Sequence, residues 1–298
     1  MPGHRVTVVV ITHNRRTELH RTLRLLTALP ERPPVVVVDN GSSDGSAAMV
    51  RRLFPWMALI PAQRNLGAVA RNLAVRQVTT PYVAFCDDDT WWEPGSLTAA
   101  ADALDRHPGV AGLTARIVVE PGGQDDPITE ELAGSPLPGG PGLPGPVLLS
   151  FLAGASVLRC QPFREVGGFS PRLWLGGEEE LLAADLITRG YLLCYLPSAV
   201  VHHQASVLRD PTHRRWLGIR NTLWFTWLRR PLCAALKRTA ELAVTVPRDR
   251  VSAGAFAAAA GGLPWVLRER RPLPPRVEAQ QRLLDAPRRA SRARRYVG

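Results

Sequence analysis

The first hundred residues alternate between short strand-like runs and amphipathic helical stripes, and this alternation constrains the fold more than any other feature. Residues 6–11 and 35–38 are apolar and β-branched, as in strands covered on both faces. Residues 16–29 between them place leucines three to four positions apart, the stripe of an amphipathic helix. Further helices are expected at 43–53 and 67–77, and further strands at 58–60 and 82–86. The pattern predicts an α/β fold with a mostly parallel central sheet and helices on both faces.

The second half of the chain is less regular. Residues 109–119 read as another strand, whereas 120–146 are so rich in glycine and proline that we expect a loop without regular structure, acting as a lid or linker. A helix is expected to begin at the acidic run 178–180 and to end before Gly190. We expect two more strands at 192–196 and 199–201, then helices from 213 onward. The pattern suggests an α/β domain over residues 1–210 and a C-terminal helical extension with a basic tail over 211–298.

Polar clusters follow four of the predicted strands. They read T-H-N-R, D-N-G-S-S-D-G, Q-R-N-L-G and D-D-D. Ligands of α/β sheets bind beyond the carboxyl ends of the strands, so one crevice could collect all four clusters. Taken alone, the D-D-D triplet is either an ordinary acidic turn or a grip for a hard divalent cation. Asp39 is either a turn former or the acceptor of hydrogen bonds from a ribose or base.

The ordered series of motifs strongly resembles the family 2 glycosyltransferases of GT-A fold, in their non-processive, rhamnosyltransferase-like form. The motifs are V-T-V-V-V-I-T-H-N-R, V-V-V-D-N-G-S-S-D-G, R-N-L-G-A-V-A-R-N, V-A-F-C-D-D-D, V-G-G-F and G-E-E-E-L-L-A-A-D-L-I-T-R-G-Y. They cover about two-thirds of the chain, and their specificity lies in the order rather than in any single motif. Processive members carry Gln-x-x-Arg-Trp, but here Thr212 stands in place of the glutamine. The resemblance therefore favours single addition of a sugar over polymerisation.

The resemblance implies transfer of a sugar from a nucleotide diphosphate donor, a UDP- or dTDP-sugar, to a hydroxyl acceptor with inversion at the anomeric carbon. It also implies Mn2+ or Mg2+ as cofactor, held by Asp87 and Asp89, with Asp88 turned towards the donor. The acceptor would belong to cell-envelope glycan, glycolipid or secondary-metabolite chemistry. The positions that match the nucleotide-sugar contacts of the family are Thr12, Asn14, Asp39, Asn65, Arg71, Asp87 and Asp88.

An inverting transfer needs a base for the acceptor hydroxyl, and the acidic run supplies the candidates. By its register with Gly190, Glu179 falls where the family usually has the Asp of a Glu-Asp pair, so the resemblance implies Glu179 as the base, with Glu178 as the alternative. Favourable placement at a helix N-terminus would also explain such acids. A histidine completes the metal shell in the family, and the spacing favours His203 over His202, against the alternative of an ordinary hydrogen-bonded histidine. Among the tryptophans, Trp174 and Trp92 are the candidates for an acceptor wall, although core packing explains tryptophan equally well.

Composition sets the remaining expectations. The net charge is +11, and basic residues gather between 268 and 295, as in a solvated tail or a patch for anionic lipid or nucleic acid. The C-terminal helices are also rich in tryptophan, so we expect their basic, Trp-rich faces to rest on an anionic membrane surface. No signal-peptide pattern is visible, and the four scattered cysteines suggest buried thiols. We therefore expect a cytoplasmic protein, either free or peripheral at the inner face of the membrane.

Two other functions compete with this interpretation. One is a sugar nucleotidylyltransferase, which would normally show a glycine-rich phosphate loop after the first strand, where this chain has T-H-N-R-R-T-E. The other is a basic nucleic-acid-binding protein, which would leave the ordered acidic motifs unexplained. We therefore expect no nucleic-acid partner.

Overall fold

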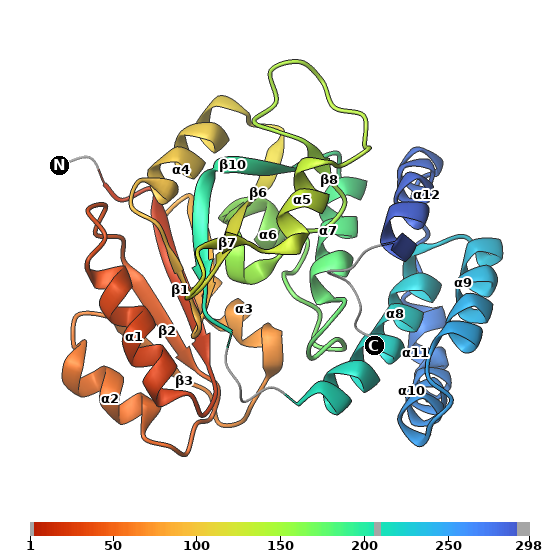
Figure 1. Cartoon of the computed structure of the whole chain (residues 1–298), viewed down its shortest axis with the longest axis horizontal. Helices are drawn as coiled ribbons and strands as arrows, with labels where there is room; N and C mark the ends of the chain where they lie inside the picture. Colours follow the sequence, from red (N-terminus) through yellow and green to blue (C-terminus); the bar gives the residue numbers. More distant parts are fainter. Residues whose placement is uncertain (1–2, 206–209, 291–298) are drawn as a thin grey trace.

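The computed structural model describes residues 3–205 and 210–290, and side chains up to residue 287. A ten-stranded sheet with strand order β3-β2-β1-β4-β9-β6-β10-β5 forms its centre, with β7 beside β6 and β8 beside β10. Helices cover both faces of this sheet, and a block of further helices lies at one end (Figure 1). The predicted α/β architecture with a C-terminal helical part is confirmed.

The parallel part of the sheet comes from the alternating first half of the chain. Its strands are β1 (Val6–Thr12), β2 (Val35–Asp39), β3 (Ala58–Pro61) and β4 (Tyr82–Asp87). The connecting helices are α1 (Arg16–Thr27), α2 (Ser46–Leu53), the short turn η1 (Gly67–Val69) and α3 (Ala70–Val75). β1 pairs in parallel with both β2 and β4, so that Thr12 lies beside Asp39 and Ile11 beside Asp87. This register brings three of the four polar clusters to one edge of the sheet.

The other part of the sheet is mixed rather than parallel. Its strands are β5 (Thr90–Trp92), β6 (Val110–Val119), β9 (Ser156–Arg159) and β10 (Leu192–His203). Its helices are α4 (Ser96–Arg106), α6 (Cys160–Glu165) and α7 (Glu178–Thr188), with the short turn η2 (Ala153–Ala155) before β9. β9 runs antiparallel between β4 and β6, whereas β6 and β10 are parallel. The two strands expected at 192–196 and 199–201 are one strand, because a register shift between Leu196 and Val200 carries the chain past Pro197.

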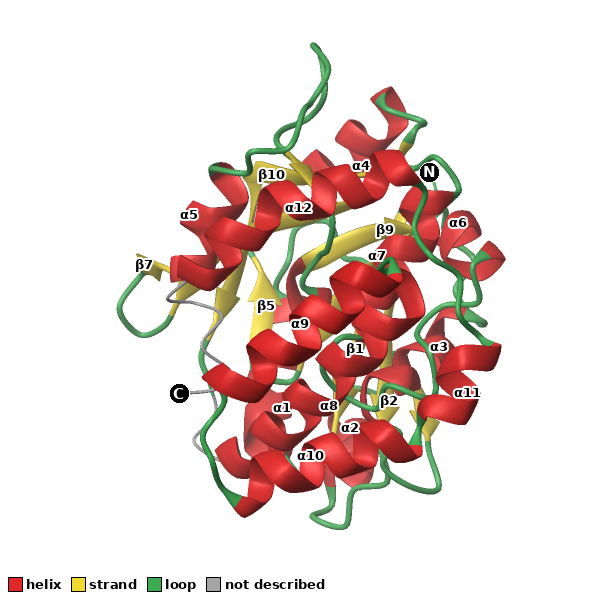
Figure 2. Cartoon of the chain, turned by 90° about the vertical axis from the view of Figure 1, so that its right-hand side faces the viewer, coloured by secondary structure: helices red, strands yellow, loops and turns green. Residues whose placement is uncertain are grey.

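The expectation that residues 120–146 lack regular structure is wrong for their first half. They contain β7 (Gln124–Asp125) and α5 (Pro127–Ala133), and β8 (Val147–Leu148) follows them. α5 has ordinary start signals: proline in its first turn, and Asp126 accepting a hydrogen bond from the Ile128 N–H at 2.9 Å. Glycine and proline dominate only in 134–146, which forms the long loop that extends from the fold between α5 and β8 (Figures 1 and 2).

Five helices form the C-terminal block, seen face-on in Figure 2. They are α8 (Pro211–Arg229), α9 (Leu232–Thr245), α10 (Arg250–Gly261), α11 (Leu263–Arg268) and α12 (Pro275–Ala290). α8 contacts α7, and Arg229 donates to Asp185 of α7 at 2.7 Å. Arg230 forms a buried ion pair with Glu278 of α12, also at 2.7 Å. The Arg229–Asp185 pair thus ties the block to the α/β part, whereas Arg230 and Glu278 join two elements of the block itself. A domain boundary at residue 210 stays a prediction.

The helix lengths, the cysteines and the basic tail complete the description of the fold. None of the helices in residues 3–205 and 210–290 combines the length and apolar character that crossing a bilayer requires. Cys86, Cys160 and Cys194 are buried, but Cys233 is exposed, which differs from the expectation that all four are buried. The last residues of the basic tail, 291–298, lie outside the described residues.

Candidate active site

The strand-end cluster begins with Thr12 and Asp39, which are both buried at neighbouring ends of β1 and β2. Asn14 follows β1 in the left-handed region, with φ of 53°. It joins the loop after β1 to the loop after β2. Its side-chain oxygen accepts a hydrogen bond from the Ser43 N–H at 2.7 Å, and its main-chain N–H donates to the Ser42 hydroxyl at 2.9 Å. Asn14 therefore shapes the rim of the cluster, and its contact with a nucleoside stays a prediction.

The three aspartates of the D-D-D triplet have different surroundings. Asp87 keeps 40% of its side chain exposed, whereas Asp88 and Asp89 keep 7% and 3%. Asp88 accepts from the Thr12 hydroxyl at 2.8 Å and from Arg15 at 3.1 Å. Burial raises the pKa of Asp88 to about 7, although Arg15 and the Thr12 hydrogen bond act in the opposite direction. Asp88 thus turns towards β1, and Asp87 is the aspartate that faces open space.

Arg15 connects two members of the triplet and was missed from the sequence. The same nitrogen, Nη1, lies 3.1 Å from Asp88 and 3.1 Å from Asp89. This guanidinium supplies the positive charge that three adjacent carboxylates need in order to lie together. Its position directly after T-H-N was a usable signal, because the end of β1 faces the end of β4 in a parallel sheet.

His202 and His203 point to opposite faces of β10, as adjacent residues of a strand must. The Nε2 atom of His203 lies 3.9 Å from an Asp89 oxygen. His202 instead stacks on Trp91 with ring centroids 5.5 Å apart, and its two nitrogens face Glu120 at 2.9 Å and Glu93 at 3.6 Å. The alternative that His202 joins the aspartates is therefore wrong, because the strand turns it away from them.

The acidic pair Glu178 and Glu179 lies in the first turn of α7, directly after Gly177 in the left-handed region. Glu178 is buried, and Glu179 accepts a hydrogen bond from the Ala153 N–H. Burial raises the pKa of both carboxyls, and the neighbouring Glu178 charge raises that of Glu179 further. A carboxylate with a raised pKa is suited to accept a proton near neutral pH.

Arg71 links the acidic pair to the triplet. It is only 4% exposed, is ion-paired with Asp87, and packs over the rings of Phe85 and Phe169 at 5.9 and 5.7 Å. Its positive charge also lowers the pKa values of both glutamates, less strongly than burial raises them. Within the described residues, Arg71 Nε and one oxygen of Glu178 are buried without a hydrogen-bond partner. Such unsatisfied polar atoms indicate a site built for a ligand.

Asn65 and Trp174 join the third strand-end loop to the segment that precedes α7. The Trp174 indole N–H donates to the main-chain oxygen of Asn65 at 3.2 Å, and the Trp174 carbonyl accepts from the Ala68 N–H at 2.9 Å. Gly67 is required here, because an added Cβ would lie 2.0 Å from the Trp174 carbonyl oxygen. The side-chain oxygen of Asn65 accepts from the Gly67 N–H at 2.9 Å, so Asn65 shapes this loop.

Trp92 is not a candidate for the acceptor wall. Its side chain is 1% exposed and belongs to the hydrophobic core, so neither face of the indole is available for a sugar ring. Trp174 is partly exposed at the edge of the site and stays the candidate. Among the other predicted residues, the three aspartates pair with Arg15 or Arg71, and Thr12 is linked to Arg15 through Asp88. The charge of Arg71 also acts on Glu178 and Glu179.

Comparison with known proteins identifies the family. Residues 7–167, more than half of the chain, match the sequence model described as Glycosyl transferase family 2. The chain belongs to this family. It is a glycosyltransferase, and the nucleotidylyltransferase and nucleic-acid-binding alternatives do not account for the match.

Two relatives of this family 2 glycosyltransferase come from Mycobacterium tuberculosis. One is named N-acetylglucosaminyl-diphospho-decaprenol L-rhamnosyltransferase and is 29% identical over 277 aligned positions, covering 79% of this chain and 90% of the relative. The other, pre-mycofactocin glycosyltransferase, is 33% identical over 220 positions, covering 70% of this chain and 45% of the relative. The chain therefore spans nearly the whole of the first relative but under half of the second.

Solved structures support the GT-A fold. The mannosyltransferase PcManGT from Pyrobaculum calidifontis, in complex with GDP-Man and Mn2+, matches with a TM-score of 0.58 and 20% identity over 96% of this chain and 87% of that chain. GalNAc-T7, with UDP, GalNAc and Mn2+, matches with a TM-score of 0.61 and 13% identity over 89% of this chain and 56% of that chain. At this level of identity the likeness concerns the fold.

The residues of the glycosyltransferase site suit a divalent cation in their chemistry. Asp87, Asp89 and His203 offer carboxylate oxygens and one imidazole nitrogen, a donor set for Mn2+ or Mg2+. The absence of a side chain at Gly154 leaves room beside Asp87, since a Cβ there would lie 2.8 Å from an Asp87 oxygen. Within the described residues, no three such side chains are already arranged around one point. Binding would therefore require the aspartates to exchange Arg15 and Arg71 for the metal.

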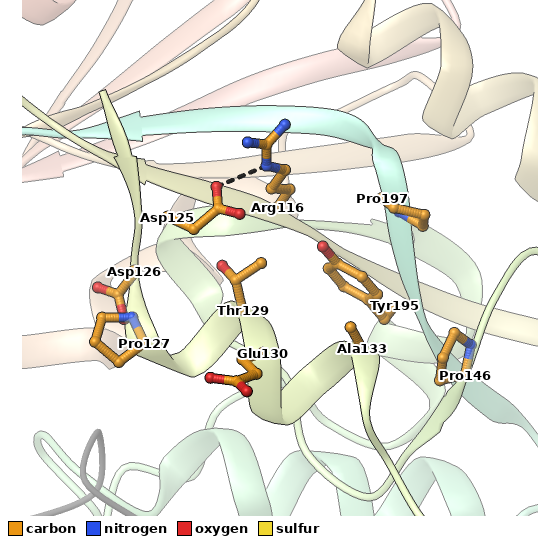
Figure 3. Close-up of a pocket in the computed structure, with 10 residues that line it drawn as sticks. All are labelled: Arg116, Asp125, Asp126, Pro127, Thr129, Glu130, Ala133, Pro146, Tyr195 and Pro197. Atoms are coloured by element: carbon orange, nitrogen blue, oxygen red, sulfur yellow. Dashed lines mark hydrogen bonds and ion pairs between the residues drawn. The ribbon is translucent and has the colours of Figure 1, made fainter. Parts of the chain in front are cut away.

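A separate cavity of about 730 Å³ lies between α5, β6 and β10 (Figure 3). Arg116 and Asp125 are ion-paired within it at 2.7 Å, and Tyr195 projects into it from β10. None of the predicted site residues lines this cavity. Converging polar groups, rather than cavity size, therefore locate the active site at the strand ends.

Proposed function

We propose that this glycosyltransferase uses a divalent metal and inverts the anomeric carbon, moving one sugar from a nucleotide diphosphate donor to a hydroxyl acceptor. The observation that carries this proposal is the pair of glutamates, Glu178 buried and Glu179 partly buried, that faces the triplet across Arg71. One side of the site thus offers a proton acceptor, and the other offers ligands for a metal-bound diphosphate.

In this mechanism the donor lies across the strand ends, with Thr12 and Asp39 at the nucleoside and Asp87 and Asp89 near the diphosphate. A bound Mn2+ or Mg2+ would neutralise charge on the departing diphosphate. Glu179 accepts the proton of the acceptor hydroxyl, whose oxygen forms a bond to the anomeric carbon. The bond from that carbon to the diphosphate breaks on the opposite face, and the diphosphate leaves with the bonding electron pair.

The surroundings favour Glu179 over Glu178 as the base. The Ala153 N–H holds one oxygen of Glu179, which leaves the other free to meet the acceptor. Glu178 is more deeply buried than Glu179. Its negative charge helps to keep the pKa of Glu179 raised, which strengthens Glu179 as a proton acceptor.

The named relatives guide the choice of substrates. One is named as a rhamnosyltransferase whose name contains a sugar diphosphate linked to decaprenol. We propose a UDP- or dTDP-sugar donor and a lipid-linked sugar acceptor used in cell-envelope glycan assembly, with glycolipids and secondary metabolites as alternatives.

A donor-hydrolysis screen tests the activity. The purified protein is incubated with a panel of nucleotide sugars and Mn2+, and the released nucleoside diphosphate is measured. Release above background is expected for one UDP- or dTDP-sugar, and a chelator should abolish it. Release that continues undiminished in excess chelator would contradict the metal-dependent mechanism.

The C-terminal block offers a surface that could contact the membrane in which a lipid-linked acceptor lies. This surface differs from the basic, Trp-rich face that the sequence predicts. Trp224 is buried, Trp216, Trp227 and Trp265 are partly buried, and Arg215, Arg229 and Arg230 are ion-paired, so these side chains contribute little to an outer basic, Trp-rich face. The outer face of α9 instead exposes apolar side chains beside Lys237. They are Leu232, Leu236 and Val244, at 57%, 60% and 71% exposure. We propose that this face of α9 contacts an anionic lipid surface.

Replacing Leu232 and Leu236 together with glutamate should abolish co-sedimentation with anionic liposomes. The two added charges oppose both burial in the lipid interface and attraction to anionic lipid. Leu53→Glu is the control, because Leu53 is a similarly exposed leucine on α2, at the other end of the molecule (Figure 1). Equal sedimentation by the double variant and the wild type would remove α9 from membrane binding.

A further inference from the structure

Aromatic rings on one face of α8 form a row with Trp174, and an arginine lies between the last two rings. His213 lies edge-on to Trp174 with centroids 5.8 Å apart and stacks on Trp216 at 6.1 Å. The guanidinium of Arg220 lies between Trp216 and Trp224, 4.7 and 4.2 Å from their rings. The row therefore runs continuously from the edge of the active site to a partly buried positive charge.

Arg220 differs from its neighbours because it has no carboxylate partner within the described residues. Arg215 faces Asp249, Arg229 faces Asp185, and Arg230 faces Glu278. Among the residues that the structure describes, Arg220 donates one hydrogen bond, from Nε to the side-chain oxygen of Asn221 at 2.9 Å.

A partly buried cation without a counter-charge is costly, and burial lowers the pKa of Arg220. Its other N–H groups form a planar fork of the kind that binds phosphate oxygens. The cation–π contacts fix the orientation of this fork but supply no negative charge. The missing partner is therefore expected to be an anion.

Asn221 connects this arginine to the segment that carries the catalytic acids. Its side chain is 0% exposed, and its amide donates to the carbonyls of Leu175 and Gly176 at 2.9 and 2.6 Å. These two residues directly follow Trp174 and are separated from Glu178 only by Gly177. Arg220 thus lies one side chain away from the segment between the proposed acceptor wall and the proposed base.

We propose that Arg220 binds the phosphate or diphosphate group through which the acceptor sugar is attached to its carrier. This inference rests on the proposed function, in which the acceptor hydroxyl meets Glu179. The sugar then lies at Trp174, and its anionic linkage extends along the aromatic row to Arg220. The donor diphosphate lies elsewhere, at Asp87 and Asp89, so the two anions have separate sites.

Binding can be measured without turnover. Calorimetry with a short-chain prenyl diphosphate, in buffer containing a chelator so that the aspartates recruit no metal-bound anion, compares the wild type with Arg220→Met. Methionine fills the space between the two indoles but removes the charge. We expect binding at least about 10-fold weaker, the loss typical of a hydrogen bond to a charged group.

Arg172→Met is the matched control. Arg172 also lies on an indole, 5.2 Å from the ring of Trp265, but it is ion-paired with Glu269. Its replacement should change the Kd less than about twofold.

Should Arg220→Met fold poorly, Arg220→Lys retains the charge and should bind within about fivefold of the wild type. Equal binding by the wild type and Arg220→Met, or equal losses in Arg220→Met and Arg220→Lys, would overturn the proposal.

Kinetics then assign the anion to the acceptor. For Arg220→Met, KM should rise at least about 10-fold more for a sugar attached through a diphosphate than for an alkyl glycoside of the same sugar. Equal increases would indicate a purely structural role and overturn the proposal.

Inorganic pyrophosphate that binds as tightly as the prenyl diphosphate would assign the site to a free anion and also overturn it. A wild type that binds prenyl diphosphate through Arg220 but hydrolyses no nucleotide sugar would refute the proposed function alone.

Discussion

Replacing Glu179 with glutamine should lower kcat for sugar transfer by about 10²- to 10⁴-fold, the range expected when a general base is lost. Glutamine has nearly the same shape and can still accept the Ala153 N–H, so the geometry of the first turn of α7 is retained. It cannot accept the acceptor proton near neutral pH. The measurement is transferred sugar per enzyme per second at saturating donor and acceptor.

Neighbouring acids provide the controls. Glu180→Gln removes the third acid of the same turn and should change kcat by less than about threefold. Glu178→Gln removes the charge that helps to raise the pKa of Glu179 and should cost less than Glu179→Gln. Full activity in Glu179→Gln together with a large loss in Glu178→Gln would transfer the role of base to Glu178.

The pH dependence follows from the raised pKa values. A base must be deprotonated to act, so kcat of the wild type should rise as the pH rises through the pKa of Glu179. The midpoint of this rise should lie well above pH 4.3, because about 4.3 is the ordinary pKa of glutamic acid and that of Glu179 is raised. A carboxyl with a raised folded-state pKa binds more protons in the folded than in the unfolded state. Its contribution to stability therefore falls as pH rises through this range. Glu179→Gln should be at least as stable as the wild type at pH 8, so a loss of kcat there cannot be attributed to unfolding.

The fold was predictable where burial alone determines the local structure. β1, β2 and β4 are continuous apolar runs, and their parallel pairing follows from the helices between them. The antiparallel insertion of β9 between β4 and β6 was not predictable, because its strand lies within an apolar run and its partners are distant in sequence. Pro197 suggested a break in what is a single strand with a bulge.

The sequence predicts which strand ends come together to form the site. It does not predict which side chains pair with one another there. The motifs located the three aspartates and the two glutamates, whereas the bridging positions of Arg15 and Arg71 depend on contacts between loops. Trp92 illustrates a different limit, because the sequence shows an aromatic residue beside an acidic motif without showing which face of the strand it occupies. Asn221 lies 45 residues from the carbonyl that it holds, and no local pattern marks it.

Replacing Asp89 with asparagine should weaken Mn2+ binding at least about 10-fold and lower the rate of transfer at least about 10²-fold. The second figure corresponds to about 3 kcal/mol of leaving-group stabilisation, a modest share of what a metal supplies. Asp89 is buried, and one of its oxygens lies 3.9 Å from His203 Nε2. Among Asp87, Asp89 and His203, the proposed metal ligands, Asp89 is therefore the one that lies beside the histidine. Electron paramagnetic resonance titration of Mn2+ measures the affinity directly, and the released nucleoside diphosphate measures the rate.

Asp88→Asn separates a metal ligand from a structural carboxylate within the same triplet. Asp88 is held by the Thr12 hydroxyl and by Arg15, so its replacement should leave Mn2+ affinity within about threefold of the wild type. Asparagine at either position can still accept a hydrogen bond from Arg15, which limits unfolding as a cause of either result. If Asp88→Asn abolishes Mn2+ binding and Asp89→Asn does not, the metal ligand is Asp88, the middle residue of the triplet, in place of Asp89. Arg15 would then have to release Asp88 when the metal binds.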